Sequence, residues 1–181
     1  GTTNPLAFEA FLQGRAGFEQ FDEVGLREGA KHYARARSID PQYAAAYAGE
    51  ARCRMNLAIV RKQRLEALDI ARRGYALAPD APATLAALCS SLSDCLRVDE
   101  ARPYYDKAFK IAPNQLDIPV VYALHMARIA ELDLARRLMA SVTARDPLNH
   151  RVWLGDALLN YWSGHFDAAL EIAEKIEQKM P

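Results

Sequence analysis

The prolines of this chain recur at a fixed interval, and this spacing limits the possible folds more than any other feature. The segments LAPDAP, IAPNQL and RDPLNH and the final residue place prolines at 79, 113, 147 and 181, so three successive steps are 34 residues each. The first step, from Pro41 to Pro79, is 38 residues. Proline lacks a backbone N–H and its ring clashes with the preceding turn, so each junction is expected to end a helix. A fixed period of this length predicts an array of helical repeats.

The stretch RSIDPQYAAAYA shows one junction in detail. We expect a helix to stop near Ser38 and the next to start just after Pro41, because the alanines that follow have the highest intrinsic helix propensity. The proline therefore marks a boundary between two helices.

The unit at 80–113 predicts two antiparallel helices. The apolar residues of its first helix recur at spacings of three and four, as one helix face requires: Leu85, Leu88, Cys89 and Leu92. Its second helix has an inner face of Ala101, Tyr105 and Ala108.

Small residues stand at matching offsets in the copies. Twelve residues before each proline are Gly29, Ala67, Ala101, Ala135 and Ala169. Twenty-four residues before the last three prolines are Cys89, Ala123 and Ala157. A small side chain lets two helices pack closely, so these positions predict the contacts between paired helices.

With these features the sequence resembles the tetratricopeptide repeat family, whose unit is a helix–turn–helix of 34 residues with two small contact positions and a closing proline. First-helix positions Gly14, Ala51, Cys89, Ala123 and Ala157 carry the resemblance together with the second-helix residues above. The resemblance implies an all-α fold, which is a right-handed α-α superhelix of about ten antiparallel helices. We expect a single array over 1–181, with repeats near 5–41, 42–79, 80–113, 114–147 and 148–181. The extra residues of the first two units are expected in the turns between paired helices.

The sequence FLQGR…GLREGAKHYARARSIDPQYAAAYAGEA is also similar to repeat regions of bacterial nucleotide cyclases and winged-helix regulators. The chain begins without methionine and ends at a repeat boundary, so we expect a piece of a larger protein. Two hypotheses stay open. One is a non-catalytic protein–protein interaction scaffold; the other is a regulatory or dimerising segment of a signalling enzyme or transcription regulator.

Charge and composition exclude several partners. The chain has 23 basic and 23 acidic residues, which gives no field to attract nucleic acid or an anionic membrane. Uncharged runs fall short of the roughly 20 residues that span a bilayer. Three cysteines without a secretory signal suggest free thiols and a cytoplasmic protein.

The resemblance places the first helices on a concave groove that binds a protein or peptide partner. The side chains expected to point into it are Phe11, Arg15, Ala48, Arg52, Met55, Ala86, Ser90, Asp94, Val120, Leu124, Arg128, Leu154, Leu158 and Tyr161. The lysine–asparagine clamp that some family members use for a terminal carboxylate is missing. An extended or helical segment with apolar anchors is favoured, with Arg52 and Arg128 pairing with its acids.

Other candidate sites have simpler interpretations. The four histidines are scattered without a metal-ligand spacing: His32, His125, His150 and His165. Cys89 is expected to fill a small core position. No phosphate loop, catalytic triad or paired carboxylates are present in the sequence, so no enzyme activity, metal or cofactor is expected.

The span 52–73 leans basic, with Glu66 and Asp69 its only acids; its basic residues are Arg52, Arg54, Arg61, Lys62, Arg64, Arg72 and Arg73. Such a run is usually a solvated helix face, and docking of an acidic protein surface is the alternative. The last helix presents Leu170, Ile172, Ile176 and Met180 without a covering repeat, which predicts possible self-association.

Overall fold

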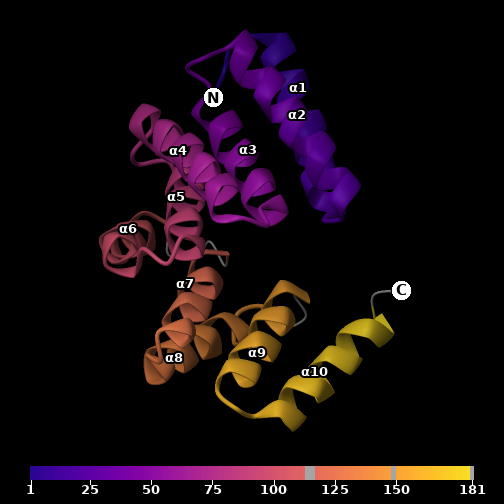
Figure 1. Cartoon of the computed structure of the whole chain (residues 1–181), viewed down its shortest axis with the longest axis vertical. Helices are drawn as coiled ribbons and strands as arrows, with labels where there is room; N and C mark the ends of the chain where they lie inside the picture. Colours follow the sequence, from indigo (N-terminus) through magenta and orange to yellow (C-terminus); the bar gives the residue numbers. More distant parts are fainter. Residues whose placement is uncertain (113–116, 148–149, 180–181) are drawn as a thin grey trace. The chain divides into compact units, whose positions relative to one another are not determined.

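The computed structural model describes residues 1–112, 117–147 and 150–179. Within these residues the chain forms ten α-helices and no strand (Figure 1). The helices are α1 (Pro5–Gln20), α2 (Glu23–Ile39), α3 (Ala44–Leu57), α4 (Arg61–Leu77), α5 (Pro82–Asp94), α6 (Val98–Ile111), α7 (Asp117–Arg128), α8 (Leu132–Thr143), α9 (His150–Trp162) and α10 (Phe166–Lys179). The expected all-α helical repeat is confirmed.

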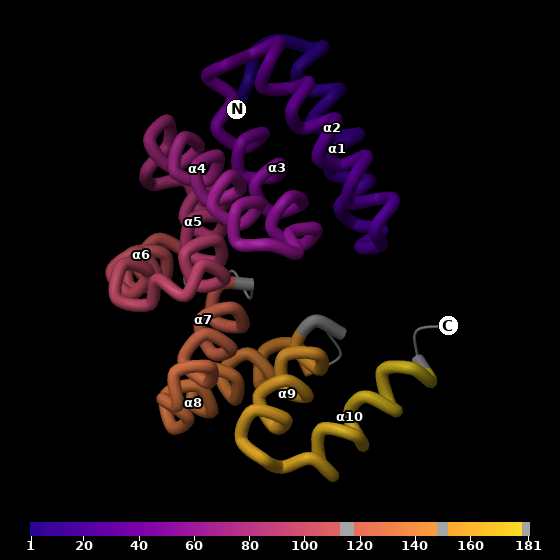
Figure 2. The backbone as a smooth tube through the Cα atoms, viewed as in Figure 1, coloured from indigo at the N-terminus to yellow at the C-terminus, as the bar shows by residue number. Residues whose placement is uncertain are grey.

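The helices divide into two compact units, Gly1–Ile111 with α1 to α6 and Ala112–Pro181 with α7 to α10. In each unit, consecutive helices joined by a short turn pack as a pair, as the tube in Figure 2 lets the reader follow. The first unit holds three such pairs and the second holds two. The single array over 1–181 stays a prediction.

The proline junctions lie between helices, as the sequence indicates. α2 ends at Ile39 and α3 begins at Ala44, so Pro41 occupies the connection. The backbone N–H of Asp40 still bonds to the carbonyl of Ala36, 2.9 Å away, which closes the last turn of α2. Pro79 and Pro147 also lie outside helices, whereas Pro113 and Pro181 are outside the described residues.

The small residues are buried where helices meet. Ala51, Cys89 and Ala123 are buried in the first helices of their pairs, and Ala67 and Ala101 in the second helices. The backbones of α1 and α2 approach closely, because a Cβ added to Gly17 would lie 2.6 Å from the carbonyl oxygen of Gly25. These positions confirm the predicted close approach between paired helices.

The expectation that extra residues lengthen the turns is wrong. Only Phe21 and Asp22 separate α1 from α2, and only Ala58 to Val60 separate α3 from α4. The additions extend the helices, which have 14 to 17 residues in the first two pairs and 12 to 14 in the others. The start of α2 is capped, because the Asp22 carboxylate accepts from the N–H of Gly25, 2.6 Å away.

The second unit has a less covered end. Met139 and Val142 of α8 and Val152 of α9 are buried between helices. On α10, Leu170 is 60% exposed, and Ile172 and Ile176 are half-buried. Met180 lies outside the described residues. The apolar side of α10 is therefore only partly covered within the described part of this unit.

Candidate partner-binding surfaces

The expected groove residues of the first unit line α1, α3 and α5, which we call the first-helix face of that unit. Ala48 and Met55 are buried and form its floor. Phe11 is half-buried, and its ring centroid lies 5.4 Å from that of Tyr33 and 5.0 Å from that of Tyr43. These three residues thus belong mainly to the packed interior.

The polar residues of this face are more accessible. Arg52 is half-buried and its guanidinium lies 4.5 Å from the ring centroid of Phe18, a distance typical of a cation–π contact. Arg15 is exposed and pairs with Glu19 at 3.0 Å. Ser90 donates to the carbonyl of Ala87. Ala86 and Asp94 are half-buried. The face therefore offers an arginine held over an aromatic ring, beside small side chains.

The expected residues of the second unit lie on α7 and α9. Val120 is buried, Leu124 and Leu158 are half-buried, and Arg128 is exposed. Leu154 and Tyr161 are exposed, and the Tyr161 ring meets that of Phe166 edge to face at 5.7 Å. This first-helix face is more apolar than that of the first unit. That either face binds a partner stays a prediction.

Several side chains of the basic span have partners, some of which lie outside the span that the sequence analysis counted. Arg72 pairs with Glu100 of α6 at 2.6 Å, and Arg73 pairs with Asp69 at 2.8 Å. Arg64 donates to the backbone carbonyl of Asp94, 3.3 Å away. Three of the seven basic side chains thus have partners on α4, α5 or α6.

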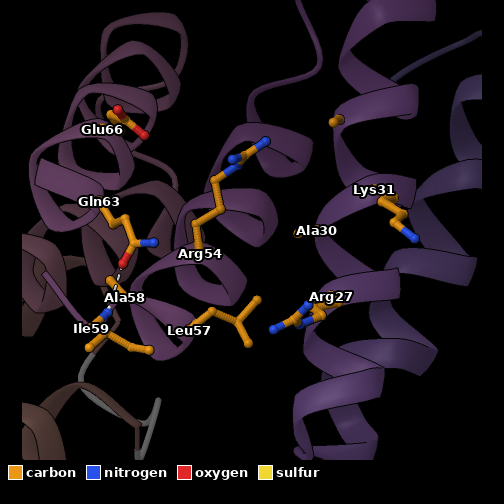
Figure 3. A pocket seen from close by; sticks show the side chains of 10 residues that line it. Arg27, Ala30, Lys31, Arg54, Leu57, Ala58, Ile59, Gln63 and Glu66 are labelled. Carbon is orange, nitrogen blue, oxygen red and sulfur yellow. Dashed lines mark hydrogen bonds between the residues drawn. The ribbon is translucent and has the colours of Figure 1, made fainter.

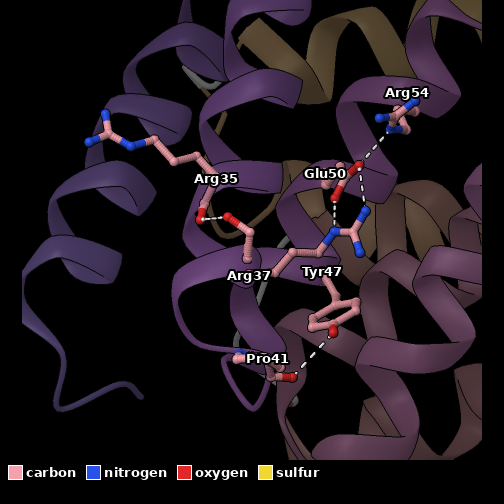
Figure 4. A network of polar contacts seen from close by, with 7 residues as sticks. Arg35, Arg37, Pro41, Tyr47, Glu50 and Arg54 are labelled. Atoms are coloured by element: carbon pink, nitrogen blue, oxygen red, sulfur yellow. Dashed lines mark hydrogen bonds and ion pairs between the residues drawn. The ribbon is translucent and has the colours of Figure 1, made fainter.

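A fourth, Arg54, belongs to a buried network centred on Glu50 of α3 (Figure 4). The Glu50 side chain is 0% exposed and accepts from Arg37 of α2 and from Nε of Arg54, 2.7 Å away. The Arg37 guanidinium also lies 5.3 Å from the ring centroid of Tyr47, whose hydroxyl donates to the carbonyl of Pro41. This network ties the first helix pair to the second. The sequence analysis missed it, although Glu50 and Arg54 stand four residues apart on one helix.

An open pocket of about 780 Å³ lies beside this network, between α2 and the α3–α4 hairpin (Figure 3). Arg27, Lys31 and Arg54 bring positive charge to its wall, and Glu66 brings negative charge. Leu57 and Ile59 supply apolar surface. The side-chain oxygen of Gln63 accepts from the N–H of Ile59, 2.9 Å away, and so fixes the rim of the pocket. Each of the three cations in its wall already pairs with an acid of the chain: Arg27 with Glu23, Lys31 with Glu28 and Arg54 with Glu50.

The cysteines are poorly reactive. Burial raises the pKa of the Cys53 and Cys89 thiols to about 12, and it also raises the pKa of the less buried Cys95. All three are free, and Cys89 fills the small core position predicted for it. In the described ranges, no group of three or more potential ligands could hold a metal ion. None of the described helices is both long enough and apolar enough to cross a membrane.

Solved structures of similar fold identify the class of architecture. TTC0263, a thermophilic tetratricopeptide repeat protein of Thermus thermophilus, aligns with a TM-score of 0.79 and 18% identity over 97% of this chain and 92% of its own. PilW, described as a widely conserved type IV pilus biogenesis factor, aligns with a TM-score of 0.71 and 17% identity over 97% and 78%. YrrB, described as a tetratricopeptide repeat protein with an unusual peptide-binding site, aligns with a TM-score of 0.54 and 19% identity over 97% and 87%.

The chain therefore has the tetratricopeptide repeat fold, as the period of 34 and the small-residue offsets indicate. No protein-family model and no curated protein matches the sequence.

Proposed function

We propose that this chain is a non-catalytic protein–protein interaction scaffold that binds a peptide segment or partner domain along its first-helix faces. The observation that carries the proposal is the Arg52 guanidinium held over the ring of Phe18. The ring limits the rotamers of the arginine, so less conformational entropy is lost when an acid binds it. The peptide-binding site named for YrrB, a protein of the same fold, agrees with such a role.

The first-helix face of the second unit, taken by itself, offers apolar anchors. Leu154 and Tyr161 are exposed and Leu124 and Leu158 half-buried, so a partner side chain that packs on them removes apolar area from water. We expect a segment bound by the first unit to contain an acidic residue for Arg52, and a segment bound by the second unit to contain large apolar residues for the leucines.

The test is a selection of displayed random peptides on the purified chain, followed by fluorescence anisotropy with the selected peptides. We expect Arg52→Ala to weaken the binding of peptides that the first unit selects, and Leu124→Ala the binding of those that the second unit selects. Each loss should be at least about tenfold, since a lost charge-assisted contact or apolar anchor is worth about 2 kcal/mol. The matched control is Arg73→Ala, an exposed arginine of α4 that pairs with Asp69. Unchanged affinity in both Arg52→Ala and Leu124→Ala would refute the proposed surface.

A dimerising segment is the second candidate, and the exposed end of the second unit favours it. Leu170, Phe166 and Tyr161 are each more than half exposed on α9 and α10. Exposed large apolar side chains at the end of a repeat array are typical of an uncapped or self-pairing end. Sedimentation equilibrium at several concentrations distinguishes the two: a monomer throughout contradicts self-association, and a dimer that Leu170→Asp dissociates supports it.

A further inference from the structure

A second, smaller pocket in the second unit lies between α8 and α9 and has a volume of about 440 Å³. Asp156 and Thr143 line one end, and Arg136 and Ser163 line the other. Met139, Ala140, Ala144 and Leu159 provide apolar surface between them. The pocket uses neither of the first-helix faces proposed above for partner binding.

Asp156 occupies the same repeat position as Glu50. Each directly precedes the small first-helix residue of its pair, Ala51 for Glu50 and Ala157 for Asp156. The intervening repeats have apolar residues at this position, Leu88 and Tyr122, and both are buried. Glu50 is fully buried and Asp156 is half-buried, and a carboxylate withdrawn from water is costly unless a partner compensates its charge.

The first unit supplies that compensation and the second does not. Glu50 is paired with Arg37 and Arg54. Thr143 and Asn160 stand at the equivalent positions around Asp156, so both arginines are replaced by neutral residues. The Thr143 hydroxyl lies 3.3 Å from the Asp156 carboxylate, while the Asn160 side-chain amide donates to the Asp156 backbone carbonyl instead.

Two further observations indicate an incomplete site. Among the described side chains, no cation pairs with the Asp156 carboxylate, and burial raises its pKa above the ordinary value of 3.8. The Ser163 hydroxyl oxygen lines the same pocket, is buried, and has no hydrogen-bond partner within the described part of the chain. Buried polar groups nearly always have partners, so the Ser163 hydroxyl is suited to a contact from a bound molecule. The Asp156 carboxylate accepts one hydrogen bond, from Thr143, and is suited to a cation.

We propose that the α8–α9 pocket binds an arginine side chain of a partner protein segment, with its guanidinium on Asp156 and a nearby acid of the same segment on Arg136. The equivalent carboxylate of the first unit already binds guanidinium groups, and the two oxygens of a carboxylate such as that of Asp156 match the fork of donors of a guanidinium. The walls from Met139 and Leu159 suit the methylene stem of arginine.

The distance between the two ends of the pocket sets the spacing in the partner. Arg136 and Thr143 are seven residues apart on α8, which corresponds to about 10 Å along the helix axis. An extended segment advances about 3.3 Å per residue, so an arginine and an acid three residues apart match the two ends. Nη2 of Arg136 lies 3.5 Å from Nδ1 of His165, and this contact helps to hold the guanidinium in place.

The experiment uses the whole chain and the acetylated, amidated probe peptide Ala-Arg-Ala-Ala-Asp-Ala, with binding measured by calorimetry and by amide shifts over residues 136–163. We expect a citrulline in place of the probe's arginine to weaken binding at least about tenfold, because citrulline keeps the shape and removes the charge. Asp156→Asn should weaken binding equally. Asp133→Asn, which changes an exposed carboxylate of α8, is the matched control and should have no effect.

Three outcomes overturn the proposal. They are an undetectable interaction with the probe, equal affinity for the citrulline peptide, and equal affinity of the Asp156→Asn variant. Blocked arginine amide is tested alongside. If it binds as tightly as the peptide, the site takes a small guanidine and the assignment to a protein segment fails. Arg52→Ala should leave the affinity for the probe unchanged, which separates this site from the first-helix faces.

Discussion

Replacement of Glu50 by glutamine tests whether the buried ion pairs hold the first two helix pairs together. Glutamine has nearly the same shape, so the change removes the charge and leaves the packing. Removal of one partner of a buried ion pair costs about 3–5 kcal/mol when the remaining charge stays buried. Here the remaining charges belong to Arg37 and Arg54, whose side chains are 29% and 45% exposed and can be partly hydrated. We therefore expect a loss of about 2–3 kcal/mol in the free energy of unfolding.

The measurement is urea unfolding followed by far-ultraviolet circular dichroism. The transition midpoint should fall while its slope stays constant, since the same surface is exposed on unfolding. Glu19→Gln is the matched control: it removes an exposed carboxylate paired with Arg15, and such surface pairs contribute about 0–1 kcal/mol.

A double-mutant cycle isolates the interaction itself. If Glu50 acts through Arg37, then Glu50→Gln costs less in the Arg37→Ala background, with a coupling of about 1 kcal/mol or more. Arg54→Ala alone should cost less than Glu50→Gln, because Arg37 still neutralises the carboxylate. A Glu50→Gln variant within about 0.5 kcal/mol of the parent chain would refute the reasoning.

Three further predictions concern packing, reactivity and pH. Gly17→Ala should lower the free energy of unfolding by about 2 kcal/mol, because the added Cβ meets backbone atoms. Gly155→Ala should change it by about 1 kcal/mol at most, because the added Cβ meets the flexible end of a methionine. Urea unfolding measures both changes. At mildly alkaline pH, iodoacetamide should label Cys95 of the native chain before Cys89. Mass spectrometry of digests measures the labelling of each cysteine, and equal labelling would contradict the burial of Cys89. Asp156→Asn should raise the free energy of unfolding at neutral pH, and this gain should vanish as pH falls below 3.8. The reason is that the raised pKa of Asp156 favours the native state only while the carboxyl is protonated. A gain that is independent of pH in urea titrations would contradict this prediction.

The helix pairs could be predicted from the sequence because their determinants are local. Pro41 and Pro79 stand well past the first turn of the preceding helices, where proline cannot continue a helix, and the alanines after Pro41 favour a new one. The offsets of Cys89 and Ala101 follow from helix periodicity, so their burial could also be anticipated.

The charge partners could not be predicted in this way. A count over residues 52–73 treats Arg54 and Arg72 as part of a basic patch, yet their partners are Glu50, outside that span, and Glu100 on another helix pair. Sequence distance says little about such contacts, since they depend on which helix faces lie together after the repeats stack.

By itself, then, the sequence determined the repeat length, the helix boundaries near the prolines and the small contact positions, because steric exclusion and helix propensity act within a few residues. Only the tertiary structure decided which acids are neutralised. Glu50 and Asp156 share one repeat position, but the residues packed against them differ: two arginines surround the first carboxylate, and neutral side chains and a pocket surround the second. The energy of a buried charge depends on its neighbours in space, and packing between helices sets those neighbours.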